Sequence, residues 1–333
     1  MKILITGAAG FIGAHLAKEM IDENIEVALI DRFSDYYAPE FKLERVRNLI
    51  NVDQSNIHRV DLSSFVETRQ ILLNVKPDAI IHLAAQPGIR LPREQNYRYL
   101  FDNMDGFTNI LNAALDASVD TVLYASSSSI YDDSGDEPFS EKVTRPNPKS
   151  FYGLTKLWNE QIAQLYANQY GMKVRGMRFF TVYGPWGRPD MAYFRIVSAC
   201  LGQYKFKLFG DGSIKRDFTF VSDVTSRIRN LLPDLMARSA GFSDVVNIGG
   251  GTPYSILDLI NEVQSRTGNE IEISRLKTNP LDLRLTVADK TYGSSIFKTE
   301  SFVNLRDGVD RVVSWAENAN IRDRLLGWIK STI

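Results

Sequence analysis

The feature that most constrains the fold is a glycine-rich turn near the start of the chain. An apolar run at Lys2–Thr6 is followed at once by Gly7, Gly10 and Gly13, and helical periodicity begins at Phe11. In a strand–turn–helix context the first glycine allows the tight turn and the second lets the backbone approach a pyrophosphate. The third permits close packing of the helix, whose N-terminus attracts the anion. The GxxGxxG spacing therefore predicts a dinucleotide-binding turn.

Strand-like and helix-like segments alternate through the first half of the chain. Apolar runs cover residues 2–6, 26–30, 56–60, 79–83, 121–125 and 173–179, and helical periodicity covers 11–20, 107–117 and 151–170. This alternation predicts an α/β fold with a Rossmann-like, doubly wound parallel sheet. After about Gly184, Pro/Gly-punctuated loops and shorter elements predict a smaller C-terminal α/β lobe, closed by amphipathic helices after Asp307. We expect a cofactor-binding Rossmann domain at 1–183 and a substrate-binding lobe at 184–333, with elements free to cross between them.

Two aspartates follow predicted strands and bear on the choice of cofactor. Asp31 comes eighteen residues after Gly13, where a carboxylate accepts both ribose hydroxyls of an adenosine and repels a 2′-phosphate. This favours NAD over NADP, although the neighbouring Arg32 leaves NADP open because it could pair with that phosphate. Asp61 could bond an adenine amino group, or cap a helix just before Leu62.

A tyrosine and a lysine stand four residues apart at the start of a predicted helix. The i,i+4 spacing places Tyr152 and Lys156 on one helix face, where the ammonium favours the phenolate form of a side chain whose ordinary pKa is near 10. Ser127 ends the fifth predicted strand, at the edge where open α/β sheets bind ligands. We interpret Tyr152 as a catalytic base assisted by Ser127 and Lys156. An exposed helix face is the alternative.

Composition narrows the class of protein. Lys and Arg number 39 against 40 Asp and Glu, so the formal charge of -1 provides no overall field for nucleic acid or an anionic membrane. Cys200 is the only cysteine, which excludes an internal disulfide. Together with three scattered histidines, it makes a poor set of zinc ligands. The N-terminal apolar run is too short for a signal or membrane segment. We expect a soluble cytoplasmic protein without a bound metal.

The GxxGxxG turn, the serine at a strand end and the Tyr-x-x-x-Lys pair follow one another in this order along the chain. In this order of motifs the chain resembles the extended short-chain dehydrogenase/reductase superfamily, and within it the NAD-dependent epimerase/dehydratase family. The run from Arg178 to Ala192, with the segments Ser34–Tyr37 and Ala84–Arg90, is most similar to the UDP-glucuronate 4-epimerases. The resemblance implies NAD as cofactor, a nucleotide-sugar substrate, most simply UDP-linked, and a homodimer formed through the helices near Phe107 and Trp158.

The resemblance also implies roles for individual residues. The implied cofactor-binding residues are Gly7, Gly10, Phe11, Ile12, Gly13, Asp31, Asp61, Leu62, Leu83, Ala84, Ala85, Asn103, Tyr152 and Lys156. The implied substrate-binding residues are Gln86, Arg90, Ser128, Ser129, Thr181, Arg188, Arg216 and Asp282. Arg188 beside a substrate carboxylate is chemically sensible, because a guanidinium pairs with a carboxylate through two hydrogen bonds.

The reaction is inferred from what the serine turn lacks. Dehydratases of this family carry Asp-Glu in the turn, and uronate decarboxylases carry a glutamate, whereas Ser128 and Ser129 stand here and cannot transfer that proton at neutral pH. A 4-epimerase needs only the tyrosine, the lysine and room for a 4-keto sugar to rotate, so we expect redox-neutral 4-epimerisation of UDP-glucuronate and UDP-galacturonate. Related decarboxylation or dehydration, UDP-hexose 4-epimerisation, and a non-catalytic NAD-binding role remain alternatives.

Three departures from the family pattern bear on the sugar. Asp132 and Asp133 add carboxylates after the serine turn, and either could enter the site and change the reaction. Leu281 replaces a glycine of the Pro-Gly-Asp motif, and Pro87 reshapes a turn that faces the substrate.

Overall fold

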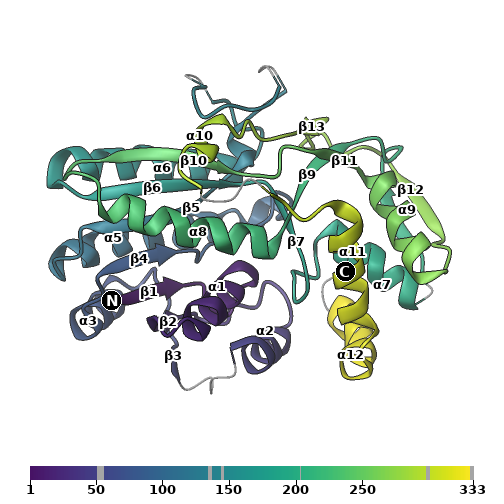
Figure 1. The fold of residues 1–333 in the computed structure, drawn as a ribbon, viewed down its shortest axis with the longest axis horizontal. Coiled ribbons are helices and arrows are strands. Elements are labelled where there is room, and N and C mark those ends of the chain that lie inside the picture. Colours follow the sequence, from purple (N-terminus) through teal and green to yellow (C-terminus); the bar gives the residue numbers. More distant parts are fainter. Residues whose placement is uncertain (51–55, 134–136, 144–145, 203, 298–300, 331–333) are drawn as a thin grey trace.

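The computed structural model describes residues 1–50, 56–133, 137–143, 146–202, 204–297 and 301–330. Its centre is a seven-stranded parallel sheet of order β10-β6-β5-β4-β1-β2-β3 (Figure 1). The strands are β1 (Lys2–Thr6), β2 (Glu26–Ile30), β3 (Ile57–His58), β4 (Ala79–His82), β5 (Thr121–Ser127), β6 (Lys173–Phe179) and β10 (Ser243–Ile248). The predicted fold class is confirmed, although the third strand has two residues rather than five.

Helices cover both faces of this sheet because successive strand residues point to opposite sides. Ile3 and Ile5 pack with α1 and α8 on one face, whereas Leu4 packs with α3, α5 and α6 on the other. These helices are α1 (Phe11–Asp22), α3 (Phe65–Val75), α5 (Gly106–Asp116), α6 (Phe151–Tyr170) and α8 (Val221–Met236). The carboxyl ends of the strands face the smaller lobe (Figure 1).

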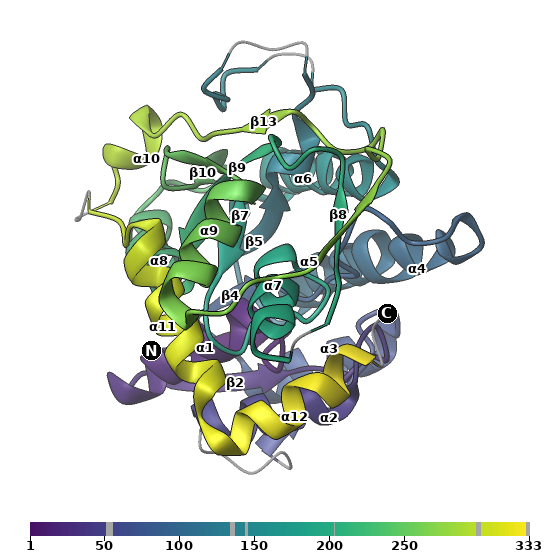
Figure 2. The ribbon, with the colours of Figure 1, turned by 90° about the vertical axis from the view of Figure 1, so that its right-hand side faces the viewer.

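The smaller lobe is built on two further sheets. One contains β7 (Thr181–Tyr183), β9 (Lys215–Phe220), β11 (Pro253–Ser255) and β13 (Leu285–Thr286), and the other pairs β8 (Phe206–Phe209) with β12 (Ile273–Leu276). Its helices are α7 (Ala192–Gly202), α9 (Ile256–Thr267), α11 (Leu305–Glu317) and α12 (Ala319–Lys330) (Figure 2), whereas α10 (Thr291–Ser294) lies against β10 of the large sheet. The chain after residue 183 also supplies β10 and α8 to the large sheet, so elements do cross between the halves.

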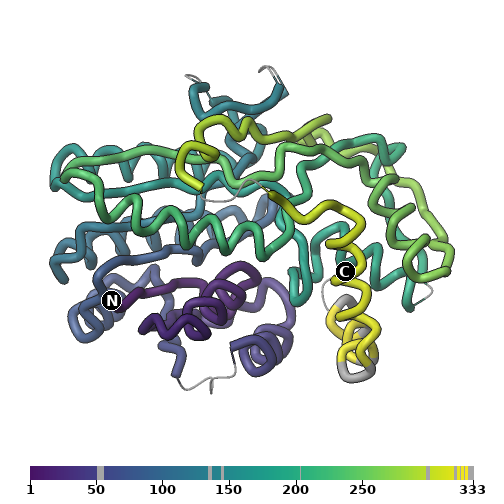
Figure 3. The backbone as a smooth tube through the Cα atoms, in the orientation of Figure 1, coloured from purple at the N-terminus to yellow at the C-terminus, as the bar shows by residue number. Residues whose placement is uncertain are grey.

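Short helical segments connect the main elements. They are α2 (Pro39–Arg45), η1 (Val46–Ile50), η3 (Arg93–Gln95), α4 (Tyr97–Tyr99), η4 (Leu100–Asp105) and η5 (Ser128–Ile130). The last two helices of the smaller lobe, α11 and α12, follow one another at the end of the described chain (Figure 3). Trp328 of α12 packs on Phe41 of α2 with 4.5 Å between ring centroids, and Arg324 pairs with Glu44 at 2.8 Å. Helix α12 thus packs against the N-terminal half of the chain.

Within the described part of the chain, no helix has the length and apolar character needed to cross a membrane.

Candidate active site

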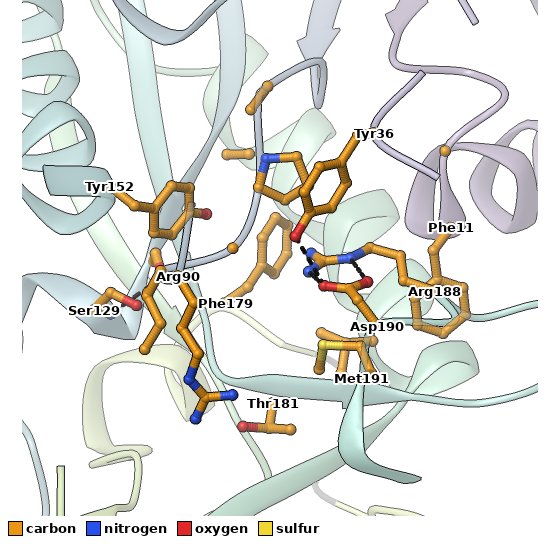
Figure 4. A pocket seen from close by; sticks show the side chains of 18 of the residues that line it. Phe11, Tyr36, Arg90, Ser129, Tyr152, Phe179, Thr181, Arg188, Asp190 and Met191 are labelled. Carbon is orange, nitrogen blue, oxygen red and sulfur yellow. Dashed lines mark hydrogen bonds and ion pairs between the residues drawn. The ribbon is translucent and has the colours of Figure 1, made fainter. Parts of the chain in front are cut away.

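A cavity of about 750 Å³ lies between the carboxyl ends of the large sheet and the smaller lobe. Its wall runs from the glycine-rich turn, past the serine turn and the first turn of α6, to β8 and the loop around Asp282. Figure 4 shows part of this wall, with Tyr152 and Ser129 facing Tyr36 and Arg188 across the space. Both halves of the chain therefore build one site.

The glycine-rich turn leaves no room for side chains. Gly7 has a φ of 70°, and a Cβ there would lie 2.7 Å from the backbone nitrogen of Ala84. A Cβ on Gly13 would lie 2.2 Å from the carbonyl oxygen of Gly7. Gly10 begins α1 without a side-chain cap, so the first N–H groups of the helix are open to an anion in the cavity.

Asp31 and Arg32 are both held in place at the end of β2. The Asp31 carboxylate accepts hydrogen bonds from the backbone N–H groups of Ala9 (3.0 Å) and Phe33 (2.7 Å). Arg32 pairs with Asp61 at 2.7 Å and with Asp102 at 2.5 Å. Because its guanidinium is already paired with two carboxylates, Arg32 is poorly suited to bind the 2′-phosphate of NADP.

The N-terminal turn of α6 places the predicted catalytic tyrosine. Ser150 caps the helix by accepting a hydrogen bond from the N–H of Gly153 at 3.0 Å. A Cβ on Gly153 would lie 2.2 Å from the carbonyl oxygen of Ser129, so only a glycine lets this turn pack on the serine turn. The close approach brings Tyr152 beside Ser127, Ser128 and Ser129 in the cavity wall.

Lys156 lies beneath the Tyr152 ring, with its Nζ 5.9 Å from the ring centroid. The lysine is 1% exposed, and its Nζ has no hydrogen-bond partner among the described residues. Burial lowers the pKa of Lys156 to about 8. Burial also raises the pKa of Tyr152, while the Arg188 charge and a hydrogen bond with Ser127 oppose this rise. Because an ammonium group only donates hydrogen bonds, an acceptor such as a hydroxyl group of a bound ligand would satisfy Lys156.

The serine turn is fixed from behind by a buried ion pair. Ser126 donates to the carboxylate of Glu160 at 2.5 Å, and Glu160 pairs with Arg178 at 2.7 Å. Ser127 accepts from the N–H of Ser129 at 3.1 Å, and its own hydroxyl hydrogen serves the bond with Tyr152. The two aspartates after the turn, Asp132 and Asp133, do not line the cavity, although Asp133 pairs with Lys149, which does.

At the far end, the wall carries a cluster of arginines and carboxylates. Arg90 pairs with both carboxylate oxygens of Asp282, at 2.7 and 2.6 Å, and Arg216 lies 3.7 Å from the same carboxylate. Nearer to Tyr152, Arg188 pairs with Asp190 at 2.6 Å. Burial works to raise the pKa of Asp190, but the Arg188 charge holds it below its ordinary value.

Two predicted site residues are not part of the described cavity wall. Gln86 and Asn103 are each 1% exposed and bond to each other, the Gln86 N–H donating to Asn103 Oδ1 at 2.8 Å. Asn103 Nδ2 also donates to Thr155 Oγ1 at 3.0 Å. These bonds attach the loop after β4 to α6, because buried backbone groups need partners. All the other predicted site residues line the cavity.

The structure adds residues that the sequence did not identify as site residues. Tyr36, Lys42, Asp190 and Arg195 also line the cavity. Burial lowers the pKa of Lys42 to about 8, and its Nζ donates to the carbonyl oxygen of Ser34 at 2.7 Å. Tyr36 and Asp190 belong to runs that carry the family resemblance, which is the one signal in the sequence that pointed to them.

The residues present fit a dinucleotide. The glycines leave open helix N–H groups for a pyrophosphate, Asp31 stands where a ribose would lie, and Lys156 has an unsatisfied ammonium. Within the described residues, no group of three or more His, Cys, Asp or Glu side chains is arranged to hold a metal ion.

Comparisons with known proteins agree with this geometry. The model of the NAD dependent epimerase/dehydratase family matches residues 3–249. A UDP-glucuronate 4-epimerase of Thermodesulfobacterium geofontis is 32% identical over 316 residues, covering 94% of this chain and 95% of the relative. UDP-glucuronic acid 4-epimerase from Bacillus cereus, solved with UDP-glucuronic acid and NAD, has a TM-score of 0.85 at 31% identity and covers 95% of this chain and 98% of its own. MoeE5, solved with UDP-glucuronic acid and NAD, has a TM-score of 0.82 at 32% identity, covering 96% and 100%.

Proposed function

The chain belongs to the NAD dependent epimerase/dehydratase family, and on that premise we propose that it interconverts UDP-glucuronate and UDP-galacturonate by 4-epimerisation. The observation that carries the proposal is Lys156, buried without a partner beneath the ring of Tyr152 in a cavity with a glycine-rich turn. The relatives from Thermodesulfobacterium and Bacillus that bear this activity in their names support the choice of reaction.

The chain's own residues hold and move the proton of the sugar. Tyr152 accepts the proton of the C4 hydroxyl, and Ser127 shares the hydrogen bond to the same oxygen. Lys156 stabilises the phenolate by its charge and bonds a ribose hydroxyl of the cofactor. NAD, when bound, would supply reversible hydride transfer at C4, so that the sugar would undergo no net redox change. Tyr152 gives the proton back in the second half of the reaction.

The proposed cofactor contacts follow the cavity wall. Gly7, Gly10 and Gly13 receive the pyrophosphate, and Asp31 accepts from the adenosine ribose. The remaining proposed contacts are Phe11, Ile12, Asp61, Leu62, Leu83, Ala84 and Ala85.

The C6 carboxylate of a uronate sugar suits the part of the cavity wall that faces away from the proposed cofactor contacts. Ser128, Ser129 and Thr181 offer neutral hydroxyl donors, and Arg188 offers a guanidinium. The serine turn carries no carboxylate, and neither Asp132 nor Asp133 is among the described residues that line this cavity. The acidic side chains that would favour elimination or decarboxylation are therefore not in place beside the sugar. At the far end, Arg90, Arg216 and Asp282 would meet the nucleotide diphosphate and its ribose.

The direct test incubates purified protein with UDP-glucuronate and resolves the nucleotide sugars by chromatography. We expect UDP-galacturonate and no release of carbon dioxide. Formation of neither UDP-galacturonate nor a 4-keto species would refute the proposal. Carbon dioxide or an unsaturated sugar would instead identify the related decarboxylation or dehydration, and turnover restricted to UDP-glucose would identify a hexose 4-epimerase.

We also propose that the protein is a cytoplasmic homodimer. Phe151, Leu154, Trp158 and Leu165 recur along one face of α6 at helical spacing. Phe151, Leu154 and Leu165 are 37–52% exposed, and η4, which packs against α6, adds further exposed apolar side chains. Such a stripe is covered in a stable protein, and a second copy would cover it. The single cysteine, Cys200, is buried, which fits a reducing compartment.

A further inference from the structure

Arg188 does not enter the cavity as a free cation. Its Nε donates to Asp190 Oδ1 at 3.0 Å and its Nη2 donates to Asp190 Oδ2 at 2.6 Å, which is a two-point pair along one edge of the guanidinium. Both side chains are 22% exposed, and Figure 4 shows the guanidinium extending from its loop toward Tyr36 and the interior of the cavity. The edge formed by Nη1 and the rest of Nη2 has no described protein partner.

A second loop holds Asp190 in turn. The hydroxyl of Tyr36, from the segment after β2, donates to Asp190 Oδ2 at 3.1 Å, and the Arg188 guanidinium lies 5.9 Å from the centroid of the Tyr36 ring. Gly88, with a φ of 87°, packs against the same hydroxyl, since a Cβ there would lie 2.5 Å from it. The loops after β2, β4 and β7 therefore meet around the Tyr36 hydroxyl.

From this arrangement we propose that Asp190, held by Tyr36, is a positioning residue that fixes the Arg188 guanidinium for the carboxylate of a uronate. Asp190 thereby sets the preference of the site for UDP-glucuronate over UDP-glucose. The inference rests on the proposed function, because it concerns the substrate carboxylate of that reaction.

The physical reason lies in the shape of the arginine side chain. A guanidinium has five N–H donors in a rigid plane, so fixing one edge fixes the direction of the other. An unpaired Arg188 would have several rotatable bonds to order when the substrate arrives, and a preorganised partner removes that cost. A neutral hydroxymethyl group at C6 cannot use the second charge-assisted pair, so it gains little from the same arrangement.

The test compares binding of two ligands that differ at C6. Dissociation constants of UDP-glucuronate and UDP-glucose are measured by calorimetry on the NAD-loaded enzyme, together with KM and kcat for UDP-glucuronate. The variants are Asp190→Asn, which keeps the shape but loses the charge, and Tyr36→Phe, which removes one hydrogen bond and leaves the ion pair. Asp116→Asn is the matched control, because Asp116 pairs with Arg69 on the surface, away from the cavity.

We expect Asp190→Asn to reduce the preference for UDP-glucuronate over UDP-glucose about tenfold, with the loss mainly in KM. Tyr36→Phe should reduce it in the same direction by a smaller factor, and Asp116→Asn should leave it unchanged. A purely structural role would weaken both ligands alike and leave their ratio intact.

An unchanged or increased preference in Asp190→Asn would overturn the inference while leaving the proposed function in place. If Asp190→Asn does not fold, Tyr36→Phe decides, and an unchanged ratio in that variant overturns the inference. Wild-type protein that neither binds nor converts UDP-glucuronate would overturn the proposed function and this inference together.

Discussion

At the scale of single residues, the site depends on a charge balance around Tyr152. Burial disfavours the phenolate, and the chain supplies Lys156 below the ring and Arg188 across the cavity as cations. Arg188 is already paired with Asp190, so Lys156 is the nearer source of unmatched charge. The pair at positions 152 and 156 was predictable because its geometry is local to one helix. The pairing of Arg32 with Asp61 and Asp102 was not, because it joins separate loops.

Replacing Tyr152 by Phe removes the proton acceptor and preserves the ring that fills the wall. We expect kcat for UDP-glucuronate to fall by about 10²–10⁴, the range for loss of a general acid–base group. NAD content, read from the absorbance of the purified protein, should be retained. Tyr170→Phe at the exposed end of the same helix is the control and should have wild-type turnover. Retained activity in Tyr152→Phe would exclude the tyrosine as the base.

Replacing Lys156 by Met tests the electrostatic role through pH. Removing a nearby cation makes the phenolate harder to form, so the pKa of Tyr152 rises and the acidic limb of the pH profile of kcat should move to higher pH. In the wild type, Lys156 loses its proton as the pH rises through about 8, so this support fades on the alkaline side. An acidic limb at the same pH in both proteins would contradict the role assigned to Lys156.

At the scale of elements, the sequence predicted the strands and helices whose signals are local, but it did not predict which distant segments pair with each other. The strand before Gly7 and the helix after Gly10 were predicted with nearly their observed bounds, because turn, cap and periodicity all lie within twenty residues. The third strand was predicted too long. Neither the pairing of β10 with β6 nor the return of α12 to α2 has a signal in the sequence, because each depends on contacts between distant segments.

Replacing Gly13 by Ala tests the glycine-rich turn as an element. The added Cβ would meet the Gly7 carbonyl oxygen at 2.2 Å, so the turn and α1 must separate, at a cost of about 1–3 kcal/mol for such overpacking. We expect the purified variant to lose its bound NAD, measured by absorbance after release. Gly327→Ala in α12 is the control, since nothing lies within 4 Å of a Cβ at that position. Full NAD content in the Gly13 variant would show that the turn does not hold the cofactor.

At the scale of the whole molecule, one cavity depends on both halves of the chain. The large sheet contributes the glycine-rich turn and the first turn of α6, while Arg216 and Asp282 come from the smaller lobe. Arg90 pairs with Asp282 across the two, so the halves are joined at the edge of the cavity as well as by the contact of α12 with α2. Sequence patterns predicted two lobes and most of the wall, but not the contacts that hold them together.

The proposed homodimer is tested at the same scale. We expect sedimentation to give a dimer for the wild type and a monomer for Leu165→Glu, which places a charge in the exposed apolar stripe of α6. Val66→Glu is the control, since Val66 is an exposed apolar residue of α3 outside that stripe. A wild-type monomer, or a Leu165→Glu dimer as stable as the wild type, would contradict the proposal.

In the proposed reaction, hydride leaves C4 of the sugar and returns to C4 of the same sugar within one site. The most direct measurement follows UDP-glucuronate labelled with deuterium at C4, incubated without added NAD and analysed by NMR and mass spectrometry. We expect UDP-galacturonate with the deuterium retained at C4, and no carbon dioxide. Loss of the label to solvent, or a requirement for added NAD in each turnover, would contradict it.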